Sequence, residues 1–216
     1  MLGGKIVALL IGYCFGLILV GYILGKTKNV DLTKVGSGNV GSTNTMRNLG
    51  VSAGLITLVC DCLKCVVAVF VVWLVFGHFY DDPAIFKVYA GLGVVLGHDF
   101  PFYMKFKGGK GVASTLGFII ALFPMALPIP AIIFIAVVAL SRYVSLGSIL
   151  GVASFAIEMI IFAKCGLLDF EGSQLTEVVI ICCLVSAIAI ALHHANISRL
   201  IHGNENKFSF HPETRA

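Results

Sequence analysis

The sequence has little charge. Of its 216 residues, 15 are Lys or Arg and 11 are Asp or Glu, so charged residues make up 12% of the chain while 58% are hydrophobic. The mean hydropathy is +0.99. Soluble domains carry about 25% charged residues, so this composition excludes an ordinary soluble domain and predicts an all-α integral membrane protein. Because a spanning helix takes ~20 apolar residues, residues 1–216 form a single polytopic domain of about seven spans.

The chain also lacks long loops and paired cysteines. Loops this short exclude a nucleotide-binding or nucleic-acid-binding module, which needs upward of ~50 residues. The seven cysteines are an odd number and lie mostly in apolar runs, which argues against a disulfide framework. Cys62 and Cys65 form a C-x-x-C pair, but without a second Cys or His pair nearby they supply only half of a zinc site. We therefore expect no metal and no cofactor.

Seven apolar segments are typical of membrane helices. They cover residues 6–24, 51–76, 84–96, 112–123, 131–140, 144–162 and 178–192. Three prolines, Pro124, Pro128 and Pro130, interrupt the run 112–140. Proline breaks or kinks a helix, so this run is either one kinked helix or two short ones.

The basic residues favour two short helices. Seven spans would place 11 of the 15 Lys and Arg residues on one side of the membrane. The positive-inside rule then puts the N-terminus outside and the C-terminus in the cytoplasm. Spans of about 10–14 residues fall short of the bilayer thickness. The eleven basic residues are Lys26, Lys28, Lys34, Arg47, Lys105, Lys107, Lys110, Arg142, Arg199, Lys207 and Arg215.

Two ionisable residues lie within the second span. Asp61 and Lys64 are three residues apart and therefore share a helix face. We interpret them as a structural ion pair, although ionisable groups at membrane depth are also candidates for function. Glu158 lies near the outer end of its span and is expected to reach the interface.

The first polar block covers residues 36–47 and is rich in glycine, hydroxyl and amide side chains. Residues 36–41 match G-x-G-x-x-G, but a membrane helix and a short linker precede them, which excludes a Rossmann dinucleotide site. Glycines still let backbone N–H groups converge on an anion. Arg47 adds a guanidinium that binds phosphate with two hydrogen bonds. The block therefore indicates an anion site.

The second and third blocks lie on the same predicted side. Residues 106–115 contain Gly-Gly-Lys-Gly before an apolar helix, which aims backbone N–H groups and the Lys110 charge at one point. A basic anchor for lipid headgroups is the alternative. The third block places His193 and Asn196 on one helix face. A shorter polar stretch, residues 141–148, adds hydroxyl groups to this side.

Taken together, the blocks resemble the bacterial acyl-phosphate:glycerol-3-phosphate acyltransferases of the PlsY type. The matching patterns are S-G-N-x-G-x-x-N-x-x-R at 37–47, G-H-x-F-P and F-K-G-G-K-G-V-A within 97–113, and H-x-x-N-I-x-R-L-x-x-G-x-E at 193–205. They occur in the family's order and cover the whole chain. The resemblance implies an enzyme of a bacterial plasma membrane, with its active site on the cytoplasmic side, that begins phospholipid synthesis.

The implied reaction transfers a fatty acyl group from acyl phosphate to the 1-hydroxyl of sn-glycerol 3-phosphate, giving lysophosphatidic acid and inorganic phosphate. By resemblance, the glycine-lysine loop binds glycerol 3-phosphate, and Glu205 stabilises the fold near the site. We expect His193 to orient or polarise a group and not to act as an obligatory base. The implied catalytic residues are Ser37, Arg47, His193 and Asn196. The implied substrate-binding residues are Asn39, Asn44, Gly108, Gly109, Lys110, Gly111 and Ser145.

Three other classes fit less well. Acyl-CoA-dependent acyltransferases carry H-x-x-x-x-D, but Tyr103 and Ser198 stand five residues after His98 and His193. CDP-alcohol phosphotransferases use several aspartates to hold metal, more than the cytoplasmic segments supply. A phosphate transporter or channel explains the basic loops equally well, but it predicts polar residues along a path through the membrane. The expected partners are the two substrates and membrane lipids, with the oligomeric state left open.

Overall fold

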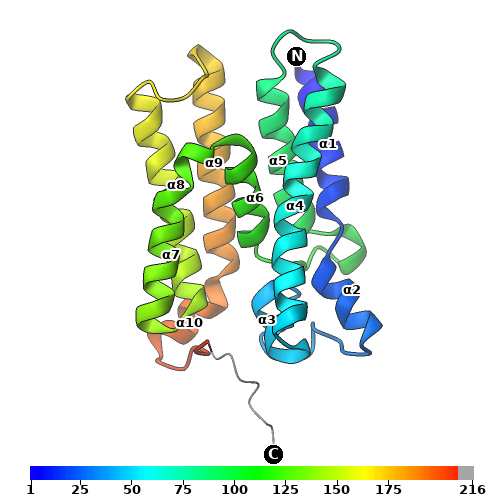
Figure 1. Cartoon of the computed structure of the whole chain (residues 1–216), viewed down its shortest axis with the longest axis vertical. Helices are drawn as coiled ribbons and strands as arrows, with labels where there is room; N and C mark the ends of the chain where they lie inside the picture. Colours follow the sequence, from blue (N-terminus) through cyan, green and yellow to red (C-terminus); the bar gives the residue numbers. More distant parts are fainter. Residues whose placement is uncertain (209–216) are drawn as a thin grey trace, which may run out of the picture.

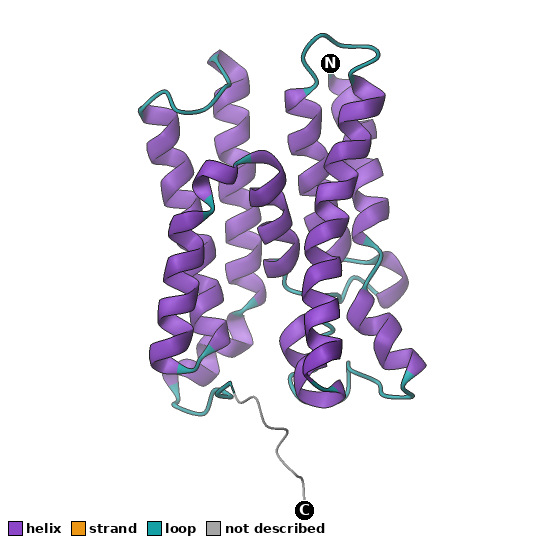
Figure 2. Cartoon of the chain, in the orientation of Figure 1, coloured by secondary structure: helices purple, strands orange, loops and turns teal. Residues whose placement is uncertain are grey.

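The computed structural model describes residues 1–208 and is helical throughout, with no strand in that range (Figure 2). Arg215 lies outside the described residues. The α-helices are α1 (Leu2–Gly16), α2 (Val20–Thr27), α3 (Ser42–Leu49), α4 (Val51–Phe76), α5 (Ala84–Asp99), α6 (Val112–Leu122), α7 (Pro128–Ser141), α8 (Val144–Lys164), α9 (Gly172–Leu192) and α10 (His194–Ile201). Two 3₁₀ turns, η1 (Phe102–Met104) and η2 (Pro124–Ala126), connect them.

The first predicted span is broken in two. α1 ends at Gly16 and α2 begins at Val20, with the chain changing direction between them (Figure 1). The break has no proline. The Lys64 ammonium on α4 lies 3.2 Å from the carbonyl oxygen of Gly16 and 2.9 Å from that of Ile18. A side chain distant in sequence therefore satisfies carbonyls that the helix end leaves without an intrahelical partner.

Glycines allow α1 to pack closely against α5. A Cβ atom on Gly12 would overlap the backbone of Ala90, and one on Gly93 would overlap the backbone of Leu9. Small residues of this kind let two helix backbones approach within a membrane. The core beside this contact is aromatic, with Phe86, Phe118 and Phe155 fully buried. Helices α1, α4 and α5 thus form one closely packed group.

The run 112–140 forms two helices, as the charge pattern favours. α6 and α7 are joined through η2, which begins at Pro124, while Pro128 and Pro130 lie in the first turn of α7. The 11 residues of α6 rise only about 16 Å, roughly half of a ~30 Å hydrocarbon core. Accordingly, the turn between α6 and α7 lies well short of the loop joining α8 to α9 (Figure 1).

Five segments of the described chain are long and apolar enough to cross a membrane: 2–27, 51–76, 124–141, 144–164 and 172–192. α5 and α6, with 16 and 11 residues, are shorter. The chain begins at the end that holds the α4–α5 and α8–α9 loops, whereas α10 and α3 lie at the opposite end (Figure 1).

The two expectations for ionisable residues have different outcomes. Asp61 and Lys64 form the expected ion pair, with 2.9 Å between the carboxylate and the ammonium. The expectation for Glu158 is wrong, because its side chain is buried in the bundle at 5% exposure. The helix α8 turns this residue inward, where its apolar neighbours Met159 and Phe155 also point.

Candidate active site

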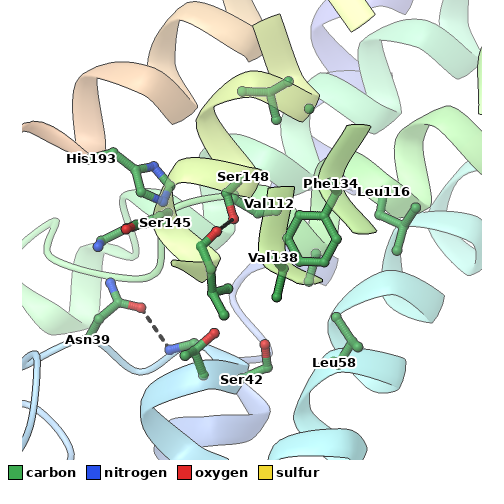
Figure 3. Close-up of a pocket in the computed structure, with 18 of the residues that line it drawn as sticks. Asn39, Ser42, Leu58, Val112, Leu116, Phe134, Val138, Ser145, Ser148 and His193 are labelled. Atoms are coloured by element: carbon green, nitrogen blue, oxygen red, sulfur yellow. Dashed lines mark hydrogen bonds between the residues drawn. The ribbon is translucent and has the colours of Figure 1, made fainter. Parts of the chain in front are cut away.

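A single cavity of about 550 Å³ collects the polar blocks. It lies between α3 and α4 on one side and α7, α8 and α10 on the other, with the start of α6 behind it. His193, Ser145 and Asn39 lie on one side of the cavity, and Phe134 and Leu116 lie on the other (Figure 3). The cavity therefore has a polar part that continues into an apolar groove.

Asn44 holds the first block in shape. Its side chain is 2% exposed, and its amide nitrogen donates to the carbonyls of Leu32, Val35 and Asn39 at 3.2, 3.1 and 2.8 Å. Its amide oxygen accepts the backbone N–H of Ser37 at 2.9 Å. The loop needs glycine at Gly36 and Gly38, because both have positive φ (59° and 71°). The Asn44 side chain thus uses these hydrogen bonds to hold the loop in its conformation.

The remaining polar residues of the block face the cavity. Ser37 and Arg47 both line it, and no hydrogen bond within residues 1–208 occupies the Arg47 guanidinium. Asn39 accepts the N–H of Gly41 at 2.8 Å and donates to the carbonyl of Gly108 at 3.3 Å. Asn39 therefore joins the first block to the second.

The glycine-lysine loop presents fewer backbone donors than its sequence suggests. The N–H groups of Gly108 and Gly109 donate at 2.9 Å to the carbonyls of Asp99 and His98 at the end of α5. They do not line the cavity, whereas Lys110 and Gly111 do. Gly111 has φ of 71° and begins α6. The start of α6, whose first N–H groups have no intrahelical partner, is thus the part of this block with backbone donors at the cavity.

The third block forms one hydrogen-bonded chain with Lys110. The Lys110 ammonium donates to the side-chain oxygen of Asn196. The Asn196 amide donates in turn to Glu205 at 2.7 Å. Glu205 also accepts from Ser145 at 2.9 Å and from Arg199 at 2.6 Å. One carboxylate therefore ties α8, α10 and the C-terminal segment to the lysine.

Burial shifts the pKa values of the ionisable residues in the polar part of the cavity. Burial, with the nearby Arg199 charge, lowers the pKa of Lys110 from its ordinary 10.5 to about 8. Burial also lowers the pKa of His193 to about 4. For Glu205, burial raises the pKa, but hydrogen bonds from Asn196, Arg199 and Ser145 outweigh it and the net pKa is lowered. Glu205 is therefore charged and His193 neutral near pH 7.

The hydrogen bonds also fix the tautomer of His193. Its Nδ1 lies 2.7 Å from the carbonyl oxygen of Ala189, which can only accept, so Nδ1 carries the proton. The other ring nitrogen, Nε2, is then a lone-pair acceptor. His193 lies at the junction between α9 and α10, and Asn196 lies in α10, so the two line the cavity from a helix junction and not from one continuous helix.

Ten of the twelve residues implied for catalysis, substrate binding or support of the site line this cavity, so the structure brings together stretches that are far apart in the sequence. These ten residues are Ser37, Asn39, Asn44, Arg47, Lys110, Gly111, Ser145, His193, Asn196 and Glu205. The cavity also contains residues that the sequence did not assign a role. Arg199 and His98 lie in the quoted motifs, Thr115 and Ser148 lie in the polar stretches 106–115 and 141–148, and Asp61 was interpreted as part of a structural ion pair.

The fold and the cavity together define an integral membrane protein with a pocket lined by basic and polar residues at one end and an apolar groove beside it. The family model described as glycerol-3-phosphate acyltransferase matches residues 6–203. The chain belongs to this family of membrane enzymes.

Relatives with that name cover most of the chain. One from Trichlorobacter lovleyi is 40% identical over 91% of this chain and 93% of its own length. One from Thermosipho melanesiensis is 38% identical over 94% and 92%. Crystal structures of PlsY, an integral membrane glycerol 3-phosphate acyltransferase, match in two forms. The glycerol 3-phosphate form has a TM-score of 0.80 and 32% identity, covering 95% of this chain and 96% of that one. The lysophosphatidic acid form has a TM-score of 0.78 and 31% identity.

Proposed function

We propose that this protein transfers a fatty acyl group from acyl phosphate to the 1-hydroxyl of sn-glycerol 3-phosphate. The observation that carries the proposal is one cavity in which Arg47, Lys110 and Arg199 supply positive charge beside an apolar groove. Two substrates with phosphate groups, one of them bearing a long chain, need both features. A transporter, the alternative, would need a polar path to the opposite end of the molecule.

In the proposed site, glycerol 3-phosphate places its phosphate at Lys110 and the start of α6. Lys110 is held by Asn196, and Gly111 allows the sharp entry into the helix. Gly108 and Gly109 act by shaping this loop, because their N–H groups are used by α5. Ser145 acts through Glu205, whose three hydrogen bonds stabilise the cytoplasmic end of the site.

The acyl phosphate places its phosphate near Arg47 and Ser37, with Asn39 and Asn44 supporting their loop. Its chain runs along α7. From Val138 to Leu127, the residue just before the first turn of α7, the chain rises about 16 Å, close to the depth of one ~15 Å leaflet. Both residues line the cavity. The groove therefore suits a fatty chain that lies within a single leaflet.

The chemical step is an acyl transfer between two bound substrates. The 1-hydroxyl oxygen attacks the carbonyl carbon, the bond from that carbon to the phosphate oxygen breaks, and inorganic phosphate leaves. Holding the two groups together and stabilising the developing charge supply the catalysis. Neutral His193 accepts a hydrogen bond from the hydroxyl and orients it, while the departing phosphate takes the proton. We expect this step to need no metal or cofactor.

We also propose seven passes, with α6 and α7 as short passes, in a bacterial plasma membrane. The N-terminus lies outside, and the active site and C-terminus lie on the cytoplasmic side. The basic loops support this orientation. A cysteine placed at Lys107 in a cysteine-free variant should react with an impermeant maleimide only after the cells are opened. A cysteine at Asp81 should react in intact cells, and the reverse pattern would refute the orientation.

The activity is tested with purified protein, glycerol 3-phosphate and either palmitoyl phosphate or palmitoyl-CoA. We expect equal amounts of phosphate and lysophosphatidic acid from palmitoyl phosphate alone. Lys110→Ala and Arg47→Ala should abolish both products. Folded protein that is inactive with both donors, or that moves phosphate across vesicles without a donor, would refute the proposal.

A further inference from the structure

A buried charged cluster lies directly beneath the glycine-lysine loop. The Lys64 ammonium is within hydrogen-bond distance of four acceptors: Asp61 Oδ1 at 2.9 Å, His98 Nδ1 at 2.8 Å, and the carbonyls of Gly16 and Ile18. The side chains of Lys64 and Asp61 are 5% and 1% exposed. One ammonium thus joins α4, α5 and the break between α1 and α2.

The contact with Lys64 determines the tautomer and the ring orientation of His98. An ammonium can only donate, so His98 Nδ1 accepts and the proton of the neutral ring is on Nε2. The ring is also held near Asp61, with 3.6 Å between Nδ1 and the carboxylate. His98 is 3% exposed and, with Asp61, lines the cavity. The ring orientation therefore depends on Lys64.

His98 supports the loop in two ways. Its carbonyl oxygen accepts the N–H of Gly109 at 2.9 Å. Its ring lies against the same glycine, because a Cβ atom on Gly109 would overlap the imidazole. The next residue, Asp99, has both carboxylate oxygens buried beside Gly111, where a Cβ atom would meet them at 2.8 and 3.1 Å. His98, which is held by Lys64, and the neighbouring Asp99 thus form the surface against which the glycine-lysine loop packs.

We propose that Lys64 and His98 are positioning residues for the glycine-lysine loop. They hold Gly109 so that Lys110 and the start of α6 face the substrate phosphate. A charged pair is not needed to pack helices, since apolar residues of similar volume often stabilise a buried site as well or better. Here the Lys64–Asp61 pair instead holds the His98 ring, which lies against Gly109, and so fixes the direction of the loop. This inference rests on the proposed function.

The test compares Michaelis constants. We expect His98→Leu, which removes the acceptor for Lys64, to raise KM for glycerol 3-phosphate about tenfold, equivalent to ~1.4 kcal/mol. kcat and KM for palmitoyl phosphate should change less than threefold. His98→Asn, which returns an acceptor oxygen, should keep KM within threefold of the wild type. Lys64→Gln should raise KM about fivefold.

The matched control is a second ion pair at the opposite end of the molecule. Lys5 and Glu177 are 2.6 Å apart, and Lys5→Met removes this pair. It should lower the melting temperature without changing KM. Stabilisation of each variant by glycerol 3-phosphate alone gives a second reading of binding that needs no acyl donor.

The outcomes separate the two proposals. An unchanged KM in folded His98→Leu or Lys64→Gln would overturn the positioning role while wild-type turnover upheld the activity. A wild-type protein with no turnover and no stabilisation by glycerol 3-phosphate would overturn the activity itself. If neither variant folded, the cluster would be a folding determinant and the positioning role would also be overturned.

Discussion

The lowered pKa of Lys110 predicts that substrate binding weakens at alkaline pH. In the empty site, burial and the Arg199 charge hold this pKa at about 8. A phosphate dianion beside the ammonium raises it again, because an opposite charge favours the protonated form. Affinity is therefore full below pH about 8 and falls as the pH rises through the interval between the free and bound pKa values.

The magnitude follows from the protonated fraction. With a pKa of about 8, roughly 90% of Lys110 is protonated at pH 7 and roughly 10% at pH 9, so KM for glycerol 3-phosphate should rise about tenfold. The substrate does not add to this slope, because the second ionisation of a phosphate monoester lies near ~6. His193 does not add to it either, since its pKa is about 4.

The assay is a series of KM measurements for glycerol 3-phosphate between pH 6.5 and 9.5 at saturating palmitoyl phosphate. A blank without enzyme corrects for hydrolysis of the donor. Lys110→Arg is the matched variant, because a guanidinium stays charged throughout this range. Its KM should be independent of pH whatever its absolute value. An alkaline rise that persists in Lys110→Arg, or a flat profile in the wild type, would refute the reasoning.

Three further predictions concern stability and specificity. Glu205 has a lowered pKa in the folded protein, so its contribution to stability is present above its ordinary pKa and is lost as the pH falls below that value. The decrease in melting temperature from pH 5 to pH 3.5 should therefore be smaller in Glu205→Gln than in the wild type. An equal decrease in both proteins would contradict this prediction. Gly12→Ala should lower the unfolding free energy by about 1–3 kcal/mol through overlap with α5, whereas Gly3→Ala, with open space around its Cβ, should leave thermal unfolding unchanged. Leu127→Trp fills the apolar end of the cavity and should lower kcat/KM for palmitoyl phosphate several-fold relative to decanoyl phosphate; equal losses for both donors would argue against that position of the chain.

The sequence predicted those parts of the fold that depend on local composition. The prolines and the charge asymmetry predicted that α6 and α7 are separate helices, and the apolar runs predicted α4, α5, α8 and α9 to within about six residues at each end, whereas the short polar helix α3 was not predicted. The break after Gly16 was not predictable, because nothing local interrupts residues 17–19. It is stabilised by Lys64, which comes from another helix.

The candidate site was predicted to a similar extent. Polar blocks rich in glycine indicated an anion site, and the family resemblance put them together. Which backbone donors are free depends on tertiary contacts, so the pattern did not reveal that α5 uses the N–H groups of Gly108 and Gly109. The sequence also marked His98, within a quoted motif, and Asp61, as an ionisable residue in a span, but it did not place either of them at the cavity, because that depends on how α4 packs against α5.

The shallow hairpin of α6 and α7 has a consequence for the energetics of a fatty substrate. Ile135 on α7 borders the cavity and is 63% exposed on the surface that faces lipid. A chain can therefore enter sideways without crossing water. Moving about 15 methylene groups through water would cost ~12 kcal/mol at ~0.8 kcal/mol each. A sideways entrance removes that barrier both when the acyl donor enters and when the product leaves. The acyl chain then stays within one leaflet, and only glycerol 3-phosphate and inorganic phosphate exchange with the aqueous phase.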